Sequence, residues 1–388
     1  MTIALDEPLL LPAPLAREIN ALSAAQRRAV VSMDHTVVLA GPGAGKTRLL
    51  VAKAAYLAFA QVHAPQRVGC LTYGAKAAEE VRRRLRSLYS GGGRNVTCAT
   101  VHSFCLAEIL TPFAVIAGHP PVGVGSVIDA SRQGVLRQLA YDRVGLQDDP
   151  RWNEHRDVAC RRALFAGENP RFDPRVIAAA KAYDQMLADD SALDFEAMVG
   201  RSLQILRDRP AVSRLIAARF PWLLVDEYQD MGPVLHAIVT TLRDAGVHIF
   251  AVGDPDQSIH GFTGSDPRYL LELANDPAFH TEPLHINYRA GQALVSAAAI
   301  VLGEDRGYTA HDQTAGGVLD HRPVAGGITD HAKQVVRVIK ELTDAGIAPH
   351  HIAVLYPRNR KNAPLRDWLL DALADAGVAV AGERAQVW

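Results

Sequence analysis

The stretch that decides the fold reads Thr36-Val-Val-Leu-Ala40, followed by Gly41-Pro42-Gly43-Ala44-Gly45-Lys46-Thr47-Arg48. The apolar, β-branched run predicts a buried strand, and the run Arg48–Ala60 after the glycines predicts a helix. The link between them fits the phosphate-loop pattern GxxxxGK[ST], except that Ala40 holds the first position. Glycines let successive backbone N–H groups surround a polyphosphate, Lys46 can reach the β- and γ-phosphates, and the Thr47 hydroxyl can ligate Mg²⁺. The alternative is a glycine-rich turn without a ligand, and the strand-loop-helix context favours a nucleotide site, which residues 41–48 would form.

A second apolar run, Leu223–Val225, ends in Asp226 and Glu227. A carboxylate at the end of a strand beside a phosphate loop can hold Mg²⁺, directly or through water, while its neighbour orients and deprotonates the attacking water. We therefore assign Asp226 to the metal and Glu227 to the water. Two surface carboxylates at a strand end are the alternative, which the nearby phosphate loop disfavours.

Short β-branched runs alternate with long Ala-, Leu- and Arg-rich stretches, a pattern typical of an α/β protein with a mostly parallel sheet. The predicted strands of a first core are Thr36–Ala40, Arg67–Thr72, Asn95–Thr100, Trp222–Asp226 and Val247–Val252. Between Cys105 and Phe220 the periodicity is helical, as in Ser131–Val144 and Pro174–Asp189, which predicts a helical insertion. A second α/β pattern begins after His280. Its expected strands lie near Gly317–His321 and His351–Tyr356, and its expected helices near Gly291–Leu302, Asp330–Ala345 and Ala363–Gly377.

The composition excludes several classes of protein. The 388 residues carry 41 Lys and Arg against 42 Asp and Glu, which argues against a uniformly basic nucleic-acid binder and against a disordered tail protein. The four cysteines, at positions 70, 98, 105 and 160, form no CxxC pair, so we interpret them as reduced and mostly structural thiols. The sequence has neither a signal-peptide pattern nor a long uninterrupted apolar run. We expect a cytoplasmic protein that has no membrane partner.

Eight segments, taken in order along the chain, resemble the motifs of superfamily 1 DNA helicases of the UvrD/Rep/PcrA type. The resemblance runs from about Leu22 to Val380. The segments are Leu22–Gln26, Cys70–Ala78, Thr100–Cys105, Asp194–Met198, Val225–Asp230, Val252–Ile259, Leu284–Arg289 and Ile352–Asn359. The resemblance implies a RecA-like P-loop NTPase sheet with a helical insertion, followed by an incomplete second RecA-like core. The expected division is 1–105 with 216–282 for the first core, 106–215 for the insertion and 283–388 for the partial second core.

The resemblance also implies roles for single residues. Gln26 would read the adenine edge, Tyr288 would stack on the adenine, and Gln257 would sense the γ-phosphate. Arg289 would act as an arginine finger that the second core supplies across a cleft. The catalytic set is then Lys46, Glu227, Gln257 and Arg289, with ATP and Mg²⁺ as the cofactors.

Contacts with single-stranded or partly duplex DNA are expected at six positions. By the pattern of the family, they are Thr72, Tyr73, His102, His260, Phe262 and Asn359. For a single aromatic side chain, packing in a core is the more common role. The arginines at 82, 83, 84 and 86 could contact phosphates, but such a run is usually a solvated helix face.

The chain departs from the family in three places. His260 and Thr263 stand where the family has Tyr and Arg, and Gly74-Ala75 replaces Thr-Asn. The last two motifs of the family, one of which bears a second arginine finger, are missing. We expect either a fragment of a longer helicase or a shortened relative, with a fragment or a split protein favoured because an unfinished parallel sheet exposes an edge. A protein partner could complete that sheet.

Three hypotheses for function follow from these observations. The leading one is an ATP-dependent helicase or translocase that steps 3′ to 5′ on single-stranded DNA, in DNA repair, recombination or phage defence. The alternative is a truncated or split ATP-binding subunit that does not unwind DNA by itself and is completed by a partner. A metabolic P-loop kinase is disfavoured because such kinases do not need Gln257 or the Asn287-Tyr288-Arg289 segment.

Overall fold

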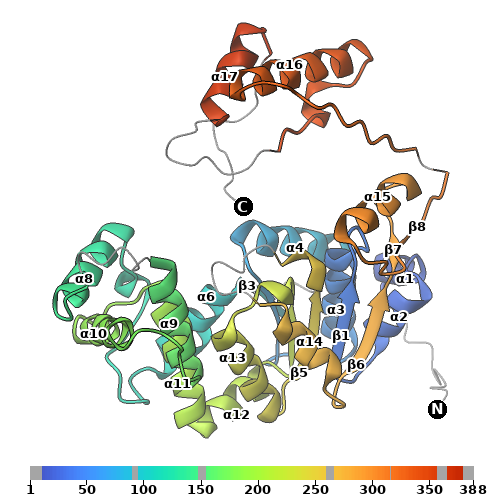
Figure 1. Ribbon diagram of the computed structural model, residues 1–388. Helices are drawn as coiled ribbons and strands as arrows, with labels where there is room; N and C mark the ends of the chain where they lie inside the picture. Colours follow the sequence, from blue (N-terminus) through green and yellow to red (C-terminus); the bar gives the residue numbers. More distant parts are fainter. Residues whose placement is uncertain are drawn as a thin grey trace. The chain divides into compact units, whose positions relative to one another are not determined.

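A computed structural model describes residues 11–89, 95–146, 154–258, 266–314, 316–355 and 365–378 (Figure 1). The chain divides into two compact units, Met1–Gly317 and Val318–Trp388. The division expected from the sequence, with an insertion and a partial second core, stays a prediction.

A parallel six-stranded sheet with the strand order β3-β2-β4-β5-β1-β6 forms the centre of the first unit (Figure 1). The predicted α/β class with a parallel sheet is therefore confirmed. Strand β1 lies between β5 and β6, with Val38 opposite Val252 on one side and Glu282 on the other. The strands are β1 (Thr36–Ala40), β2 (Val68–Thr72), β3 (Val96–Thr100), β4 (Trp222–Val225), β5 (His248–Gly253) and β6 (His280–Leu284).

Apolar cores cover both faces of this sheet because successive strand residues point to opposite sides. On β4, Leu223 and Val225 belong to one core, whereas Trp222 and Leu224 belong to the other. The second of these cores is built from α1 (Ala13–Asn20), α2 (Ala24–Val31), α3 (Lys46–Ala60) and α4 (Ala75–Leu88). The first includes α6 (Val101–Phe104), the π-helical turn Cys105–Leu110, α13 (Pro233–Asp244) and α14 (Arg268–Asn275).

The region of the expected insertion is helical, and its helices lie at one side of the sheet (Figure 1). They are α7 (Thr111–Phe113), α8 (Ala130–Asp142), α9 (Glu154–Ala166), α10 (Pro174–Asp189), α11 (Phe195–Asp208) and α12 (Pro210–Arg219), with a 3₁₀ turn at Val124–Ser126. Helix α11 packs against α13, so the apolar core of the sheet continues into these helices without a break. A small separate core under α8, α9 and α10 contains Tyr141, Cys160 and Val176.

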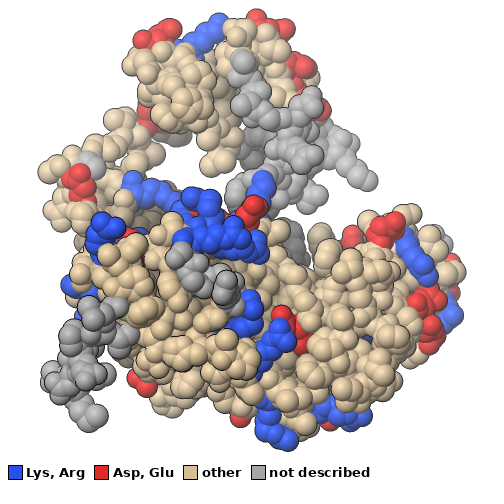
Figure 2. Space-filling view, turned by 180° about the vertical axis from the view of Figure 1, so that it is seen from behind, with Lys and Arg blue, Asp and Glu red and all other residues tan. Residues whose placement is uncertain are grey.

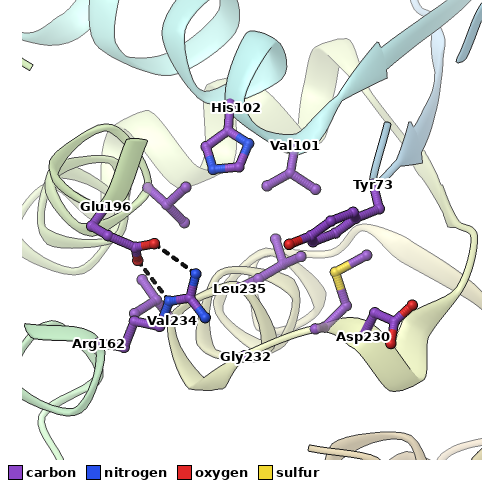
Figure 3. A pocket seen from close by; sticks show the side chains of 11 residues that line it. Tyr73, Val101, His102, Arg162, Glu196, Asp230, Gly232, Val234 and Leu235 are labelled. Atoms are coloured by element: carbon purple, nitrogen blue, oxygen red, sulfur yellow. Dashed lines mark hydrogen bonds and ion pairs between the residues drawn. The ribbon is translucent and has the colours of Figure 1, made fainter. Parts of the chain in front are cut away.

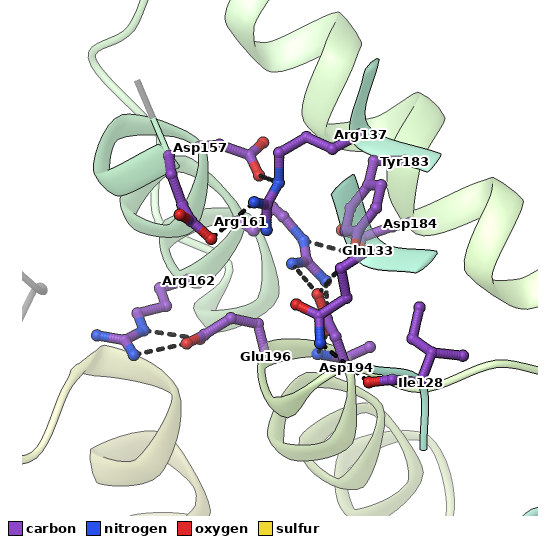
Figure 4. Close-up of polar contacts among 12 residues, drawn as sticks. Ile128, Gln133, Arg137, Asp157, Arg161, Arg162, Tyr183, Asp184, Asp194 and Glu196 are labelled. Atoms are coloured by element: carbon purple, nitrogen blue, oxygen red, sulfur yellow. Dashed lines mark hydrogen bonds and ion pairs between the residues drawn. The ribbon is translucent and has the colours of Figure 1, made fainter. Parts of the chain in front are cut away.

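A buried polar cluster joins α9, α10 and α11 (Figure 4). The Arg161 side chain is fully buried and donates hydrogen bonds to Asp184 at 2.6 and 2.9 Å and to Asp194 at 2.7 and 2.9 Å. Asp194 also accepts a hydrogen bond from the Tyr183 hydroxyl and caps α11 through the Ala197 backbone N–H. This set of bonds fixes the three helices relative to one another.

The sequence did not predict β6, and the expected boundary between residues 282 and 283 falls inside it. Strand β6 reads His-Thr-Glu-Pro-Leu and lacks the β-branched run that marks the other strands. Pro283 is tolerated there because β6 is the edge strand beside β1. The following segments are β7 (Ile286–Asn287), α15 (Gln292–Leu302) and β8 (Thr309–Ala310), and β7 and β8 form a separate two-stranded parallel sheet.

The second unit is helical in its described residues, with α16 (Ile328–Asp344), a 3₁₀ turn at Pro349–His351 and α17 (Leu365–Asp375). Ile339, Leu369 and Leu373 form its core. Helices were predicted at these positions, but the strands predicted near 317–321 and 351–356 were wrong for the described residues. An apolar run forms a strand only where another strand pairs with it, and the described part of this unit offers none. Across the described residues, no helix combines the length and the apolar character needed to span a membrane.

Candidate nucleotide site and nucleic-acid surface

The loop between β1 and α3 has the shape that the sequence predicted. Gly43 and Gly45 adopt left-handed backbone angles, with φ of 68° and 81°. A side chain at Gly43 would also meet Asn287, whose Oδ1 would lie 2.5 Å from an added Cβ. These glycines let the chain fold back on itself before α3, whose N-terminus carries a partial positive charge that suits a phosphate.

Lys46, the first residue of α3, lies between two carboxylates. Its Nζ is 3.8 Å from Asp254 Oδ2 and 3.9 Å from Glu227 Oε2. The Lys46 side chain is one-tenth exposed, and Asp254 is completely buried. These distances are longer than a hydrogen bond, so the ammonium group is held near both carboxylates by attraction of charge and keeps its donors available for another acceptor.

Asp226 and Glu227 follow β4 and differ in their surroundings. Asp226 is buried, and this burial together with the charge of Glu227 raises its pKa to about 7, although the Glu227 backbone N–H bonds to it and Lys46 opposes the shift. Glu227 is partly exposed and has a φ of 49°, a left-handed angle that is uncommon outside glycine. Gln229 holds its carboxylate by donating to Oε2 at 2.8 Å. Backbone strain of this kind concentrates at functional sites.

Two residues at this site were missed by the sequence reasoning, which gave neither of them a role. Asp254, after β5, accepts a hydrogen bond from Gln257 Nε2 at 2.6 Å, and burial raises the pKa of its carboxyl. Gln229 accepts from the Asp254 backbone N–H at 2.9 Å while donating to Glu227. Gln229 lies in the motif-like segment Val225–Asp230 and Asp254 in Val252–Ile259. Their positions in these two segments could have pointed to a role at the site. Together they connect Gln257 to Lys46 and Glu227.

Gln26 lies against the phosphate loop. Its Nε2 donates to the Ala44 carbonyl at 3.0 Å, and its Oε1 accepts from the Ser23 backbone N–H at 3.0 Å, which closes the N-terminal cap of α2. The side chain is 2% exposed. Gln26 therefore supports the loop directly, and adenine recognition by this residue stays a prediction.

The segment Asn287-Tyr288-Arg289 reaches the opposite side of the loop. The Tyr288 backbone N–H donates to the Gly43 carbonyl at 2.9 Å, and Asn287 Oδ1 accepts from the backbone N–H groups of Arg289 and Ala290 at 2.7 and 2.8 Å. Tyr288 is 40% exposed, and its ring packs against His311 at 4.8 Å between ring centroids. Arg289 is exposed beside it. The structure thus brings Tyr288 and Arg289 to the loop that contains Lys46.

The remaining predicted loop residues surround this centre. Thr47 is partly buried in the first turn of α3, Pro42 is exposed, and Ala44 is buried. Arg48 forms an ion pair with Glu18 of α1. Against Gly41 lies the ring of Tyr308, which the sequence reasoning did not single out. Arg306, next to it, forms a two-pronged ion pair with Asp256, with distances of 3.1 and 2.8 Å.

The donor groups at this site fit a magnesium ion. Mg²⁺ takes oxygen ligands from one or two protein groups and from phosphates, and Thr47 supplies a hydroxyl and Asp226 a carboxylate. Burial and the charge of Glu227 raise the pKa of Asp226, and a divalent cation beside it would oppose both effects.

Two of the six predicted DNA-contacting residues meet at one pocket (Figure 3). Tyr73 is 46% exposed and lines the pocket together with His102, which packs edge-on against Phe195. On the opposite wall, Arg162 donates to both oxygens of Glu196 at 2.6 and 2.7 Å. Burial lowers the pKa of His102. The end of β2, α6 and the helices α9 and α11 therefore share this pocket.

The other DNA-contact predictions have different outcomes. Thr72 is buried, and its hydroxyl donates to the Gly74 carbonyl at 3.0 Å. His260, Phe262 and Asn359 lie outside the described residues. Lys and Arg side chains gather on the face shown in Figure 2, and the α4 arginines 82, 83, 84 and 86 are all exposed. Arg83 and Arg84 form ion pairs with Glu80 on the same helix.

Comparison with known proteins gives one family. The model of the UvrD/REP helicase N-terminal domain matches residues 22–131 and 149–278. The chain is 29% identical to the ATP-dependent DNA helicase UvrD1 of Mycobacterium tuberculosis, over 93% of this chain and 50% of that protein. It is 27% identical to DNA helicase II of Escherichia coli, over 91% of this chain and 51% of the relative. A third relative, the ATP-dependent DNA helicase PcrA of Bacillus subtilis, is 26% identical over 73% of this chain and 40% of its own length.

The chain spans about half the length of the first two of these relatives. The family model covers well over half of the chain, and its matched segments contain the phosphate loop, the pair Asp226-Glu227 and Gln257. This chain belongs to the UvrD/Rep family of helicases.

Proposed function

We propose that this chain contains the ATP-hydrolysing core of a DNA helicase or translocase that tracks along single-stranded DNA from 3′ to 5′. The observation that carries the proposal is the position of Lys46, at the end of a glycine-rich loop and within 4 Å of both Glu227 and Asp254. The proposed settings are DNA repair, recombination or phage defence in the cytoplasm, since the relatives are DNA helicases.

In the proposed reaction, the loop N–H groups and Lys46 bind the β- and γ-phosphates of ATP. Glu227 orients the attacking water and accepts its proton, while Gln229 holds that carboxylate in place. Thr47 and Asp226 would hold Mg²⁺, which neutralises charge that develops on the phosphate oxygens. Gln257, held on buried Asp254, would sense whether the γ-phosphate is present.

Coupling to movement would come from the segment that follows β6. Tyr288 would stack on the adenine and Arg289 would reach the γ-phosphate as an arginine finger, an interaction that is worth about 10³–10⁵ in rate in other nucleotidases. The hydrogen bond from Tyr288 N–H to Gly43 already joins this segment to the loop. If ATP hydrolysis needs groups from both sides of the loop, it occurs only when the two sides come together. That movement would also shift any DNA bound to either side.

The nucleic-acid ligand would be single-stranded or partly duplex DNA, with bases packed on exposed aromatic side chains such as Tyr73. Stacking of this kind contributes about 1–3 kcal/mol per base without strong sequence preference. His102 shares a pocket with Tyr73, and both follow strands that end at the same edge of the sheet as the phosphate loop. A DNA strand at that edge would lie close enough to respond to nucleotide hydrolysis.

The test is Mg²⁺-dependent ATP hydrolysis by the 388-residue chain with and without single-stranded DNA. We expect a severalfold stimulation by DNA, and its loss in Lys46→Ala. Tyr73→Ala should keep the DNA-free rate and lose most of the stimulation, whereas Tyr56→Phe, on α3 in the core, serves as a matched control. ATP hydrolysis that is indifferent to DNA would contradict the motor proposal.

A second candidate function is ATP binding without independent turnover, in a subunit that a protein partner completes. The short β7–β8 sheet favours this function, because among the described residues after β6 no other strands form. That function predicts nucleotide binding by calorimetry together with negligible hydrolysis, and it is excluded if the chain unwinds DNA by itself.

A further inference from the structure

Two of the four cysteines lie side by side in the sheet, although 27 residues separate them in the sequence. Cys70 on β2 is opposite Cys98 on β3 in the parallel register, and β3 is the edge strand. Paired residues on neighbouring strands lie about 4.8 Å apart. This separation falls within the range of about 4.4–6.8 Å between Cα atoms that a disulfide requires.

The two thiols differ in access to solvent. Cys70 is completely buried, whereas Cys98 is partly exposed and lines a cleft of about 420 Å³ between β3, α4 and α6. The same cleft is lined by Arg82 and Ser103. A small solute can therefore approach Cys98 but not Cys70.

Positive charge surrounds Cys98. Arg82 donates to the Cys98 carbonyl at 2.9 Å, and Arg67 donates to its neighbour Thr97 at 2.6 Å. A hydrogen bond from the Cys70 thiol lowers the pKa of Cys98, and Arg82, Arg67 and Arg86 lower it further, although burial opposes them. The same hydrogen bond and burial raise the pKa of Cys70, so of the two thiols Cys98 is the one that ionises more readily.

The other two cysteines provide an internal contrast. Burial raises the pKa of Cys105 to about 12 and that of Cys160 to about 11. Both residues are buried, and burial is the main cause of both shifts. A thiol of this kind reacts slowly with oxidants, because the thiolate is the nucleophile.

We propose that Cys98 and Cys70 form a peroxide-reactive dithiol, in which Cys98 is the attacking residue and Cys70 resolves the product into a disulfide between β3 and β2. The Cys98 thiolate attacks one oxygen of hydrogen peroxide, the O–O bond breaks, and hydroxide leaves and is protonated to water. Cys98 is then a sulfenic acid. The Cys70 thiol loses its proton and attacks the Cys98 sulfur, the S–O bond breaks, and a second water leaves. The two thiols lose two electrons and two protons, and the peroxide is reduced to two waters.

The test treats the reduced 388-residue protein with a small excess of hydrogen peroxide, followed by peptide mapping. We expect a Cys70–Cys98 disulfide that dithiothreitol reverses, while Cys105 and Cys160 remain thiols. In Cys70→Ala, a sulfenic acid should accumulate on Cys98 and be trapped by dimedone. In Cys98→Ala, Cys70 should stay reduced.

Two further variants separate this proposal from general oxidation. The double variant Cys105→Ser with Cys160→Ser should form the disulfide at the wild-type rate. Arg82→Gln should slow the reaction severalfold, because the charge of Arg82 lowers the pKa of Cys98 and the thiolate is the attacking form. The proposal is overturned if native Cys98 reacts no faster than Cys105, or if its sulfenic acid persists with Cys70 present. Because both of these readings use the wild-type chain, they do not depend on how well a variant folds.

Discussion

The site around Lys46 and the cluster around Arg161 contain the same kinds of charged group and differ in the distances between them. Each has one cation with little exposure to solvent between two carboxylates, one buried and one partly exposed. Arg161 makes four hydrogen bonds of 2.6–2.9 Å with Asp184 and Asp194. Lys46 stands 3.8 and 3.9 Å from its two carboxylates, and one of these belongs to a residue with a left-handed backbone. A cluster whose bonds are complete holds helices together, whereas one whose donors are still available can bind a ligand.

The largest expected effect is on the free energy of unfolding, at the cluster around Arg161. Arg161→Met should lower the free energy of unfolding by about 3–5 kcal/mol, because it leaves buried Asp194 and partly buried Asp184 without their cation. Urea unfolding measures the change. Adding Asp184→Asn and Asp194→Asn should recover part of the loss, since the uncompensated charge is then removed. A midpoint that does not move in Arg161→Met would show that the cluster is not structural.

The next effect is on ATP hydrolysis, at the site around Lys46. Lys46→Ala should reduce ATP hydrolysis by about 10²–10³-fold, the cost of removing one preorganised donor to a charged transition state. Its free energy of unfolding should change far less than that of Arg161→Met, because the Lys46 ammonium makes no close bond to either carboxylate. The comparison of the two clusters fails if Lys46→Ala is the less stable of the two variants.

A third buried cation gives a smaller effect that depends on pH. Lys53, on the same helix as Lys46, donates to the Val30 and Ser32 carbonyls and lies 4.6 Å from the centre of the Trp222 ring. Burial lowers its pKa from 10.5 to about 7. Between these values the unfolded chain binds more protons than the native protein, so stability rises with pH by up to about 1.4 kcal/mol per pH unit. Below pH 7, where Lys53 is protonated in both states, the stability gained at higher pH is absent.

Urea unfolding between pH 7 and pH 9.5 measures the slope, and Lys53→Met is the matched variant. The difference in slope between the two proteins isolates Lys53 from all other groups. We expect the free energy of unfolding of Lys53→Met to change less with pH over this interval. Equal slopes would mean that the native Lys53 keeps an ordinary pKa, and that its carbonyl and aromatic neighbours offset the effect of burial.

The smallest effect is expected at an exposed ion-pair cluster. Glu80 on α4 bonds to Arg83 and Arg84, and these bonds lower the pKa of its carboxyl to about 2. Water and salt screen these charges, so Glu80→Gln should leave the unfolding midpoint unchanged within error. A clear loss of stability would indicate that short distances alone, without burial, account for the strength of the Arg161 cluster.

The sequence was most informative where chemistry is carried by contiguous residues. The phosphate loop, the pair after β4 and the segment after β6 were each assigned before the structure, and five strands were found within a residue or two of their observed bounds. Strand β6 was missed because its sequence, His-Thr-Glu-Pro-Leu, has a proline and a glutamate and lacks a β-branched run. The strands expected near 317–321 and 351–356 were wrong for the described residues of these ranges, because an apolar pattern says nothing about whether a partner strand is present.

By itself, then, the sequence determined the α/β class, the phosphate loop and the family resemblance, because each of these is written in short local patterns. The tertiary structure alone decided which carboxylates flank Lys46, that Gln26 supports the loop, and that Gln229 joins Asp254 to Glu227. It also decided that Cys70 meets Cys98 and that Arg161 is enclosed by aspartates from two other helices. The physical reason is that these contacts depend on the order and register of parallel strands and on the packing of helices, which bring together residues that no local pattern connects.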